Sequence, residues 1–158
     1  MKMSKKVLFG FGMLSSLITV GLIVGVFYVI EPLLLENFAV GVGYNIIIDR
    51  NADDDYAYMI SKLCELKKSE ESKIYCVYNF FRSVSRYDYQ DKINSLNFTL
   101  TNSSDCKNAV VFYCAVFKNL NISCQPNRIE GHTFATVQFD EGYCNIDQKF
   151  IDCKYLGD

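Results

Sequence analysis

The stretch that decides the fold runs from residue 105 to residue 124 and reads DCKNAVVFYCAVFKNLNISC. Ser104 and Asp105 are residue types that cap helix N-termini, and apolar residues then recur at helical spacing. This pattern predicts a helix that starts at the Ser104-Asp105 cap and is ended by Asn121. Its expected inward-facing residues are Ala109, Val110, Tyr113, Phe117 and Leu120.

After this helix the sequence changes to short β-rich runs. Residues 122–128 predict a strand, which Pro126 confines to an edge or a bulge because proline cannot donate a ladder hydrogen bond. Residues 132–139 and 143–147 predict the two strands of a hairpin joined through Asp140-Glu141-Gly142. The chain therefore ends in antiparallel strands.

The register of this hairpin decides whether His132 and Asp147 meet. If residues 139–142 form a four-residue loop with Gly142 in the left-handed conformation, Gln138 opposes Tyr143. His132 and Asp147 are then diagonal neighbours on one face of the sheet. A loop of three residues would place them on opposite faces.

Upstream, the sequence predicts two amphipathic helices and a long loop. The first helix begins at the acidic residues 53–55, and the second is capped by Ser69 with Glu70 and Glu71 in its first turn. Residues 87–104 show no period, and long loops in compact domains are often functional. Helices followed by antiparallel strands predict an α+β fold. The expected buried stripes are Tyr56, Met59, Ile60, Leu63 and Cys64 on the first helix, and Ile74, Val77, Tyr78, Phe81 and Val84 on the second.

Residues 7–30 form an apolar segment without a single charge. A helix needs about 20 apolar residues to cross a bilayer core, so the segment predicts a transmembrane signal anchor whose partner is the lipid bilayer. Lys2, Lys5 and Lys6 precede it, and Glu31 and Glu36 follow it. This asymmetry predicts a single-pass protein of the cell membrane with a cytoplasmic N-terminus and an extracytoplasmic domain. A cleaved signal peptide is the alternative.

The expected organisation is therefore a cytoplasmic N-terminus (1–6), a signal anchor (7–30), a stem (31–48) and one domain (49–158). Within and next to the stem, Asn45–Asp49 is expected to form a short strand or an extended arm. Of the 16 Lys and Arg residues, three precede the anchor, which leaves 13 against 18 Asp and Glu in the remainder. An acidic domain of this kind is a poor partner for nucleic acid.

The chain has seven cysteines, and an odd number leaves at least one thiol unpaired or bonded to another chain. With Cys106 set aside, the other six could form three bridges in fifteen ways. Local spacing favours the pairs Cys64–Cys76, Cys114–Cys124 and Cys144–Cys153. The alternative is that Cys64 and Cys114 are buried thiols.

Two further features agree with an extracytoplasmic location of the domain. Disulfides persist in oxidising compartments. Three glycosylation sequons also occur, at Asn97, Asn102 and Asn121.

Three residues form a candidate catalytic set: Cys106 at a helix start, the single histidine His132 and Asp147 at a strand end. The thiolate is the nucleophilic form of cysteine, and a helix N-terminus favours its negative charge. An imidazole can take the thiol proton and return it to a leaving group, and a carboxylate on the other ring nitrogen fixes the tautomer.

The sequence also resembles the transglutaminase-like superfamily. The resemblance lies in the run 105–124 quoted above, in GHTFATVQF (131–139), in GYCNID (142–147) and in the upstream KIYCVYNFFRSVSRYDY (73–89). It implies a papain-like Cys-His-Asp fold, in which helices pack on a small antiparallel sheet and the nucleophile lies at a helix N-terminus. Carried over by position, Cys106 is the nucleophile, His132 the general base and Asp147 the residue that orients it.

The resemblance implies a thiol hydrolase or acyltransferase that acts on a peptide or cell-envelope amide, and it leaves hydrolysis and transfer equally open. Tyr87 and Gln90, in the aromatic turn before the nucleophile, are the candidates for a side-chain oxyanion donor. The alternative function is a non-catalytic, disulfide-braced binding module on the same fold. No metal site and no cofactor are predicted, because the chain lacks a C-x-x-C pair and has one histidine.

Overall fold

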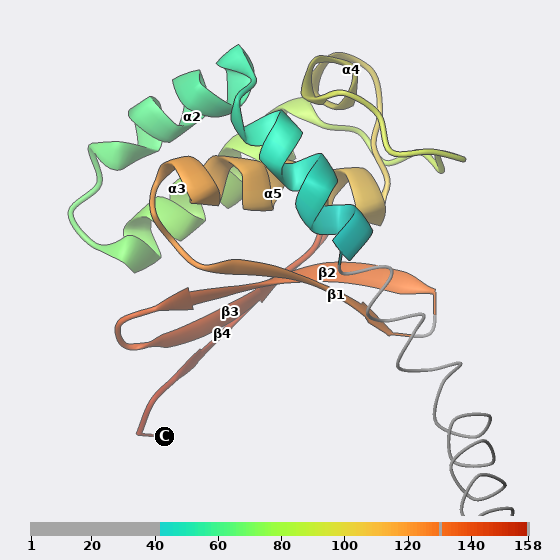
Figure 1. Ribbon diagram of the computed structural model, residues 1–158. Helices are drawn as coiled ribbons and strands as arrows, with labels where there is room; N and C mark the ends of the chain where they lie inside the picture. The colour runs from blue at the N-terminus through green and yellow to red at the C-terminus, as the bar shows by residue number, and fades with distance from the viewer. Residues whose placement is uncertain (1–41, 130, 158) are drawn as a thin grey trace, which may run out of the picture. The chain divides into compact units, whose positions relative to one another are not determined.

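The structure is a computed structural model that describes residues 42–129 and 131–157. The described chain begins with a helix over residues 42–52. The helices α2 (Asp55–Glu65), α3 (Glu70–Val84), α4 (Leu96–Thr101) and α5 (Cys106–Asn119) follow it. The strands are β1 (Cys124–Ile129), β2 (His132–Phe139), β3 (Gly142–Ile146) and β4 (Ile151–Tyr155). They form one antiparallel sheet in the order β1-β2-β3-β4, and the helices lie over one of its faces (Figure 1).

The fold prediction must be corrected where it placed a membrane-spanning helix in front of the domain. None of the helices in residues 42–129 and 131–157 has both the length and the apolar character needed to cross a bilayer. Residues 7–30, on which that prediction rested, lie outside the described residues. The described chain is a mixture of helices and a small four-stranded antiparallel sheet.

Helix α5 forms the centre of the core. It packs on β1 and β2 on one side and on α2, α3 and α4 on the other. Every residue from Asn108 to Phe117 is buried, which is the pattern of a helix enclosed on all sides rather than of an amphipathic one. The aromatic rings of Phe112 and Tyr113 contact Phe81 of α3, with centroids 4.8 and 5.0 Å away. The nucleophile candidate therefore sits at the end of the best-packed element.

Helices α2 and α3 begin where their caps predict, but α2 is rotated from the predicted orientation. The side chains of Asp54 and Ser69 accept hydrogen bonds from main-chain N–H groups of the first turn of each helix. On α2 the buried residues are Ala57, Ile60, Ser61 and Cys64, so only two members of the predicted stripe are buried. On α3 the prediction holds except at Val84, which is 40% exposed.

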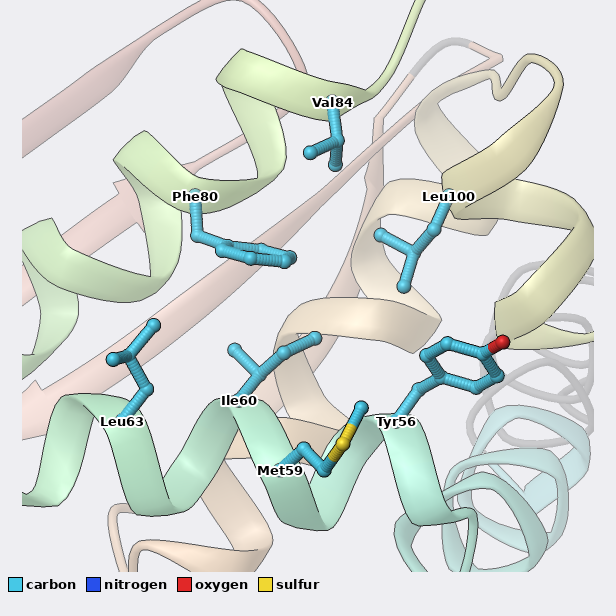
Figure 2. A pocket seen from close by; sticks show the side chains of 7 residues that line it. All are labelled: Tyr56, Met59, Ile60, Leu63, Phe80, Val84 and Leu100. Atoms are coloured by element: carbon cyan, nitrogen blue, oxygen red, sulfur yellow. The ribbon is translucent and has the colours of Figure 1, made fainter.

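The rest of the predicted α2 stripe faces an open apolar groove between α2, α3 and α4. The groove has a volume of about 430 Å³. Figure 2 shows the side chains of α2, among them Tyr56 and Met59, along one side of the groove, with Phe80 and Val84 of α3 and Leu100 of α4 across from them. The apolar residues of α2 are thus divided between the core and this groove, which is why the buried face of α2 differs from the predicted stripe.

Three elements differ from the sequence prediction. Residues 42–52 are helical, although Asn45–Asp49 was expected to be a short strand or an extended arm. Residues 87–104 are not a continuous loop, since Ser95 caps the short helix α4 within them. Strand β4 was not predicted, and it completes the sheet beside β3.

Of the two hairpin registers that the sequence left open, the structure has the one in which Gln138 pairs with Tyr143. The turn differs from the one expected for that register, because Phe139 pairs with Gly142 around a two-residue turn. Gly142 does not adopt a positive φ. It is required for a different reason: a Cβ at this position would lie 2.0 Å from the main-chain oxygen of Lys154 in β4.

We therefore expect Gly142→Ala to be strongly destabilising. The close contact is with backbone, so β4 must move away from β3, and overpacking of this kind costs about 1–3 kcal/mol. Urea unfolding followed by circular dichroism measures the loss. Gly43→Ala is the matched control, because a Cβ there meets nothing within 4 Å and a helical alanine should be neutral or stabilising. Equal stability of the two variants would contradict the prediction.

Three disulfides are formed, and they are the three that local spacing favoured. Cys64–Cys76 joins α2 to α3, and Cys114–Cys124 joins α5 to the start of β1. Cys144–Cys153 joins directly opposed residues of β3 and β4. Cys106 is the free cysteine of the described chain.

Candidate active site

Cys106 is the first residue of α5 and lines a cavity of about 390 Å³. His132 and Thr133, at the start of β2, line the same cavity. Its wall also contains Gly131, whose φ of 81° is a left-handed conformation that lets β1 turn sharply into β2. The nucleophile and base candidates, 26 positions apart in the sequence, thus face one solvent-accessible space. Other residues lining it are Tyr44, Tyr87, Tyr89, Asp91, Asp105, Lys107 and Arg128.

His132 and Asp147 are in direct contact. The Nε2 atom of His132 lies 3.0 Å from Oδ2 of Asp147, as expected for diagonal cross-strand neighbours. With Nε2 directed to the carboxylate, Nδ1 is the ring nitrogen that remains to exchange a proton with another group. The contact therefore favours the neutral tautomer in which Nε2 carries the proton and Nδ1 can accept one.

Asp147 is held so firmly that only one of its carboxylate oxygens faces His132. Its other oxygen, Oδ1, accepts hydrogen bonds from the main-chain N–H groups of Lys149 and Phe150, the second at 2.7 Å. The hydroxyl of Tyr113 in α5 donates to the main-chain oxygen of Asp147 at 3.2 Å. The turn that follows β3 therefore holds the carboxylate of Asp147, and Tyr113 of α5 binds the main chain of the same turn.

The turn is also attached to α3. The hydroxyl of Tyr78 and the guanidinium of Arg82 donate to the main-chain oxygen of Lys149, at 3.1 and 2.6 Å. These contacts bring the helical layer into the positioning of Asp147. The site is built from the N-terminus of α5, the start of β2 and the turn after β3.

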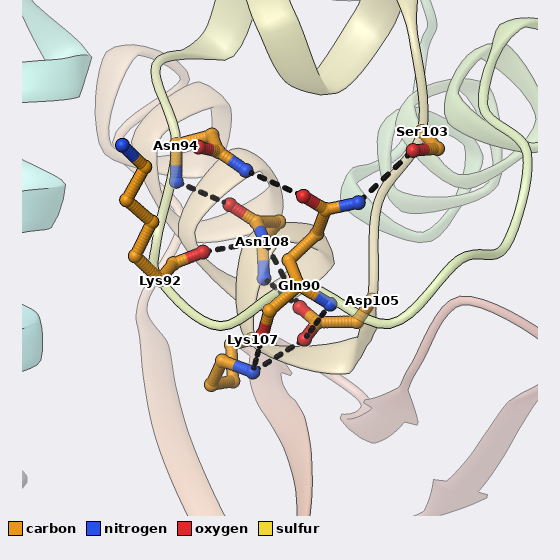
Figure 3. Close-up of polar contacts among 7 residues, drawn as sticks. All are labelled: Gln90, Lys92, Asn94, Ser103, Asp105, Lys107 and Asn108. Carbon is orange, nitrogen blue, oxygen red and sulfur yellow. Dashed lines mark hydrogen bonds and ion pairs between the residues drawn. The ribbon is translucent and has the colours of Figure 1, made fainter.

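Asp105 organises the loop in front of Cys106. It is 2% exposed, and its Oδ1 accepts hydrogen bonds from the main-chain N–H and the side-chain amide of Asn108, at 3.2 and 3.0 Å. Its Oδ2 accepts from the ammonium of Lys107 and from the main-chain N–H of Gln90. Figure 3 shows this cluster joining residues 90–94 to the first turn of α5.

Burial alone would raise the pKa of the Asp105 carboxyl, but the hydrogen bonds from Lys107 and Asn108 outweigh it and hold that pKa below its ordinary value. Burial alone would lower the pKa of Lys107, but its pairing with Asp105 raises it instead. The pair is therefore ionised at neutral pH. Because the two charges largely cancel, the pair adds little net charge to the cavity. Its main effect is to hold the loop at Gln90, whose main chain binds both side chains.

This pairing predicts a loss of stability in acid. A carboxyl whose pKa is depressed by folding stabilises the domain above its unfolded pKa, and that contribution is lost as the pH falls through the lower, folded value. We expect Asp105→Asn to remove about 2 kcal/mol at pH 7, the contribution typical of hydrogen bonds to a charged group. The difference from the wild type should shrink below about pH 4.

Urea titrations between neutral and acidic pH measure both effects. Asp54→Asn is the matched control, since Asp54 also caps a helix but its hydrogen bond to the Tyr56 N–H is exposed. A difference between wild type and Asp105→Asn that stays constant with pH would contradict the prediction.

The two sequence candidates for an oxyanion donor are placed differently. Tyr87 lines the cavity but is 57% exposed, and the ammonium of Lys149 lies 4.5 Å from the centre of its ring. The amide of Gln90 donates to Ser103 at 3.0 Å and accepts from Asn94 at 3.2 Å, so both of its ends hold the loop.

Tyr44 was not predicted as a site residue, yet it lines the cavity and is 8% exposed. It was assigned to the stem, but Tyr44, Ile48 and Ala52 are all buried at a spacing of four, a helical period that could have been noticed. The sequons lie elsewhere: Asn97, Asn102 and Asn121 are all exposed.

A second cavity lies on the other side of His132. It has a volume of about 490 Å³ and is lined by Ile129, His132, Phe134, Asn145, Phe150 and Asp152. Phe134 and His132 alternate along β2 with the buried Thr133 and Ala135, so this cavity lies on the sheet face away from α5. The imidazole thus borders two spaces.

Comparisons of the chain with models of protein families, with curated proteins and with solved structures find no match.

Proposed function

We propose that this chain is a thiol enzyme of the transglutaminase-like kind, which cleaves or transfers at an amide bond through an acyl-enzyme on Cys106. The observation that carries the proposal is the 3.0 Å contact between His132 and Asp147, beside a cavity that also contains the free thiol. The sequence resemblance in residues 73–89, 105–124, 131–139 and 142–147 supports the same assignment.

In the first half of the reaction, Nδ1 of His132 takes the thiol proton and the Cys106 sulfur attacks the amide carbonyl carbon. The new S–C bond converts the carbonyl oxygen to an oxyanion. A helix leaves the N–H groups of its first residues without intrahelical partners, so the Cys106 N–H is available to donate to that oxyanion. When the C–N bond breaks, His132 returns the proton to the leaving amine, and the acyl group remains on sulfur as a thioester.

In the second half, water or an amine attacks the thioester and gives up a proton to Nδ1 of His132. The C–S bond breaks, the acid or the new amide leaves, and the proton returns to the sulfur. Asp147 stabilises the imidazolium in both halves through Nε2.

The proposal is tested by chemistry at Cys106. Iodoacetamide should alkylate Cys106 faster than it alkylates glutathione near neutral pH, and p-nitrophenyl acetate should transfer its acetyl group to the same residue. A library of short peptides with hydroxylamine as the acceptor should then yield hydroxamates that require the thiol. Cys106→Ala is the matched control for all three reactions.

A binding module gives no reason for a reactive thiol. If Cys106 reacts no faster than glutathione and takes up no acetyl group, the enzyme proposal fails and the binding module is the better account. Hydroxamate formation by the Cys106→Ala protein would also exclude an acyl-enzyme on Cys106.

The same proposal places the enzyme outside the cytoplasm, where disulfides persist. It is supported by the three bridges of the domain. Protease added to intact cells should remove an epitope fused after Asp158. Survival of the epitope until the cells are lysed would show that the domain is inside.

A further inference from the structure

Tyr44 is the one buried tyrosine in the wall of the Cys106 cavity. It comes from the helix over residues 42–52, and its hydroxyl lies close enough to that of Thr133, the neighbour of His132, to interact with it. Thr133 is itself 3% exposed. The mechanism proposed above gives no role to this phenol, which shares its cavity with a free thiol and with the base candidate.

The position of Tyr44 is fixed by the packing of its helix on α5. Near the C-terminal end of that helix, the Asn119 amide donates to the main-chain oxygen of Ala52 at 2.8 Å, and the Lys118 ammonium lies 2.7 Å from Oδ1 of Asp49. Near its N-terminal end, Tyr44 lies by the start of α5. The two helices run in the same direction, as Figure 1 shows, so two attachments at one end set the position of the phenol at the other.

Burial raises the pKa of the Tyr44 hydroxyl above its ordinary value. The hydrogen bond from Thr133 opposes this shift, while the nearby Cys106 adds to it. The phenol therefore keeps its proton over the pH range in which a thiol enzyme works. Because Thr133 can donate to the phenol oxygen, the O–H of Tyr44 remains available to donate into the cavity.

A tetrahedral intermediate is best stabilised by two donors, and only one, the Cys106 N–H, has been assigned. Gln90 has both ends of its amide engaged, and Tyr87 is more than half exposed. We propose that the Tyr44 hydroxyl is the second oxyanion donor, a catalytic residue contributed by the helix over residues 42–52. This inference rests on the proposed function, since it needs an acyl transfer at Cys106.

The alternative is that the Tyr44 hydroxyl donates to the Cys106 sulfur. Two reactions of the same thiol separate these roles. Acetylation by p-nitrophenyl acetate passes through an oxyanion before p-nitrophenolate leaves. Alkylation by iodoacetamide forms the S–C bond as iodide leaves, and it forms no oxyanion. A donor to sulfur affects both reactions, whereas a donor to the oxyanion affects the first alone.

The experiment measures both rates from pH 6 to pH 9 for the wild type, Tyr44→Phe and Tyr58→Phe. Tyr58 is an exposed tyrosine of α2, so its variant controls for the loss of a hydroxyl. We expect Tyr44→Phe to lower the rate of acetylation about 10²-fold, as for the loss of other oxyanion donors, with alkylation unchanged within about twofold. Thermal unfolding of each variant verifies that the domain is folded.

Equal losses in both reactions would overturn the inference and assign Tyr44 to the thiol. Unchanged acetylation in Tyr44→Phe would also overturn it, while leaving the proposed function intact. A wild-type protein that is not acetylated at all would overturn the proposed function and this inference together. The three failures are therefore distinguishable.

Discussion

Replacing His132 with alanine should lower the rate of Cys106 acetylation about 10³-fold at neutral pH, within the range that a general base contributes. Asp147→Asn should cause a loss of similar size for a different reason. Oδ1 of Asp147 lies between the N–H groups of Lys149 and Phe150, so the carbonyl oxygen of asparagine will take that position. Its NH₂ then faces Nε2 of His132 and forces the proton onto Nδ1. That tautomer cannot accept the thiol proton.

The pH dependence of the rate distinguishes this mechanism from general damage. Both variants should recover at higher pH, because the thiolate then forms without a base. Stopped-flow measurement of p-nitrophenolate release gives the profiles. Asp140→Asn, in the exposed β2–β3 turn, should retain the wild-type profile. A deficit that is the same at every pH would count against the assigned roles.

Reduction of the three disulfides should unfold the domain. The bridged cysteines are 12, 10 and 9 positions apart. In the loop-closure account each bridge contributes about 2.7 kcal/mol, or about 8 kcal/mol for all three. A domain of this size has a total stability of about 5–15 kcal/mol, so the reduced form should retain little or no cooperative structure.

Thermal unfolding with and without a phosphine reductant measures this effect. The Cys106→Ala protein is the suitable background, because it removes exchange with the free thiol. Replacing both cysteines of one pair by serine should lower the free energy of unfolding by about 2–4 kcal/mol for each of the three pairs. A reduced protein that unfolds cooperatively within a few degrees of the oxidised one would show that the core is sufficient without its bridges.

Sequence reasoning was most successful where local rules operate. The helix starts at residues 53–55 and at Ser69 follow from residue types alone. The β2–β3 register was one of the two that the possible loop lengths allowed. The bridges belong to the same class, since each joins consecutive elements. The contact of His132 with Asp147 could be predicted because it depends on that register.

It was least successful where tertiary packing overrides local preference. Helix α5 is buried on every side, so no amphipathic stripe describes it. Residues 42–52 contain three consecutive isoleucines and two glycines nearby, which favour extended or irregular backbone, yet packing against α5 makes them helical. Gly142 was assigned to a turn, whereas its requirement comes from β4, a strand that had not been predicted. The position of Tyr44 beside Cys106 was missed together with its helix.

The order of the bridges bears on how the protein matures. Each pair is complete before the next pair begins, so if the domain is translocated in chain order, each cysteine of a pair meets its correct partner within 12 residues. Cys106 alone interrupts this order, since it emerges ahead of Cys114 on the same helix. Once α5 has formed, the rise between them is about 12 Å, too far for a disulfide. In the proposed extracytoplasmic location, the helix that presents the thiol would thus also keep it from pairing with Cys114.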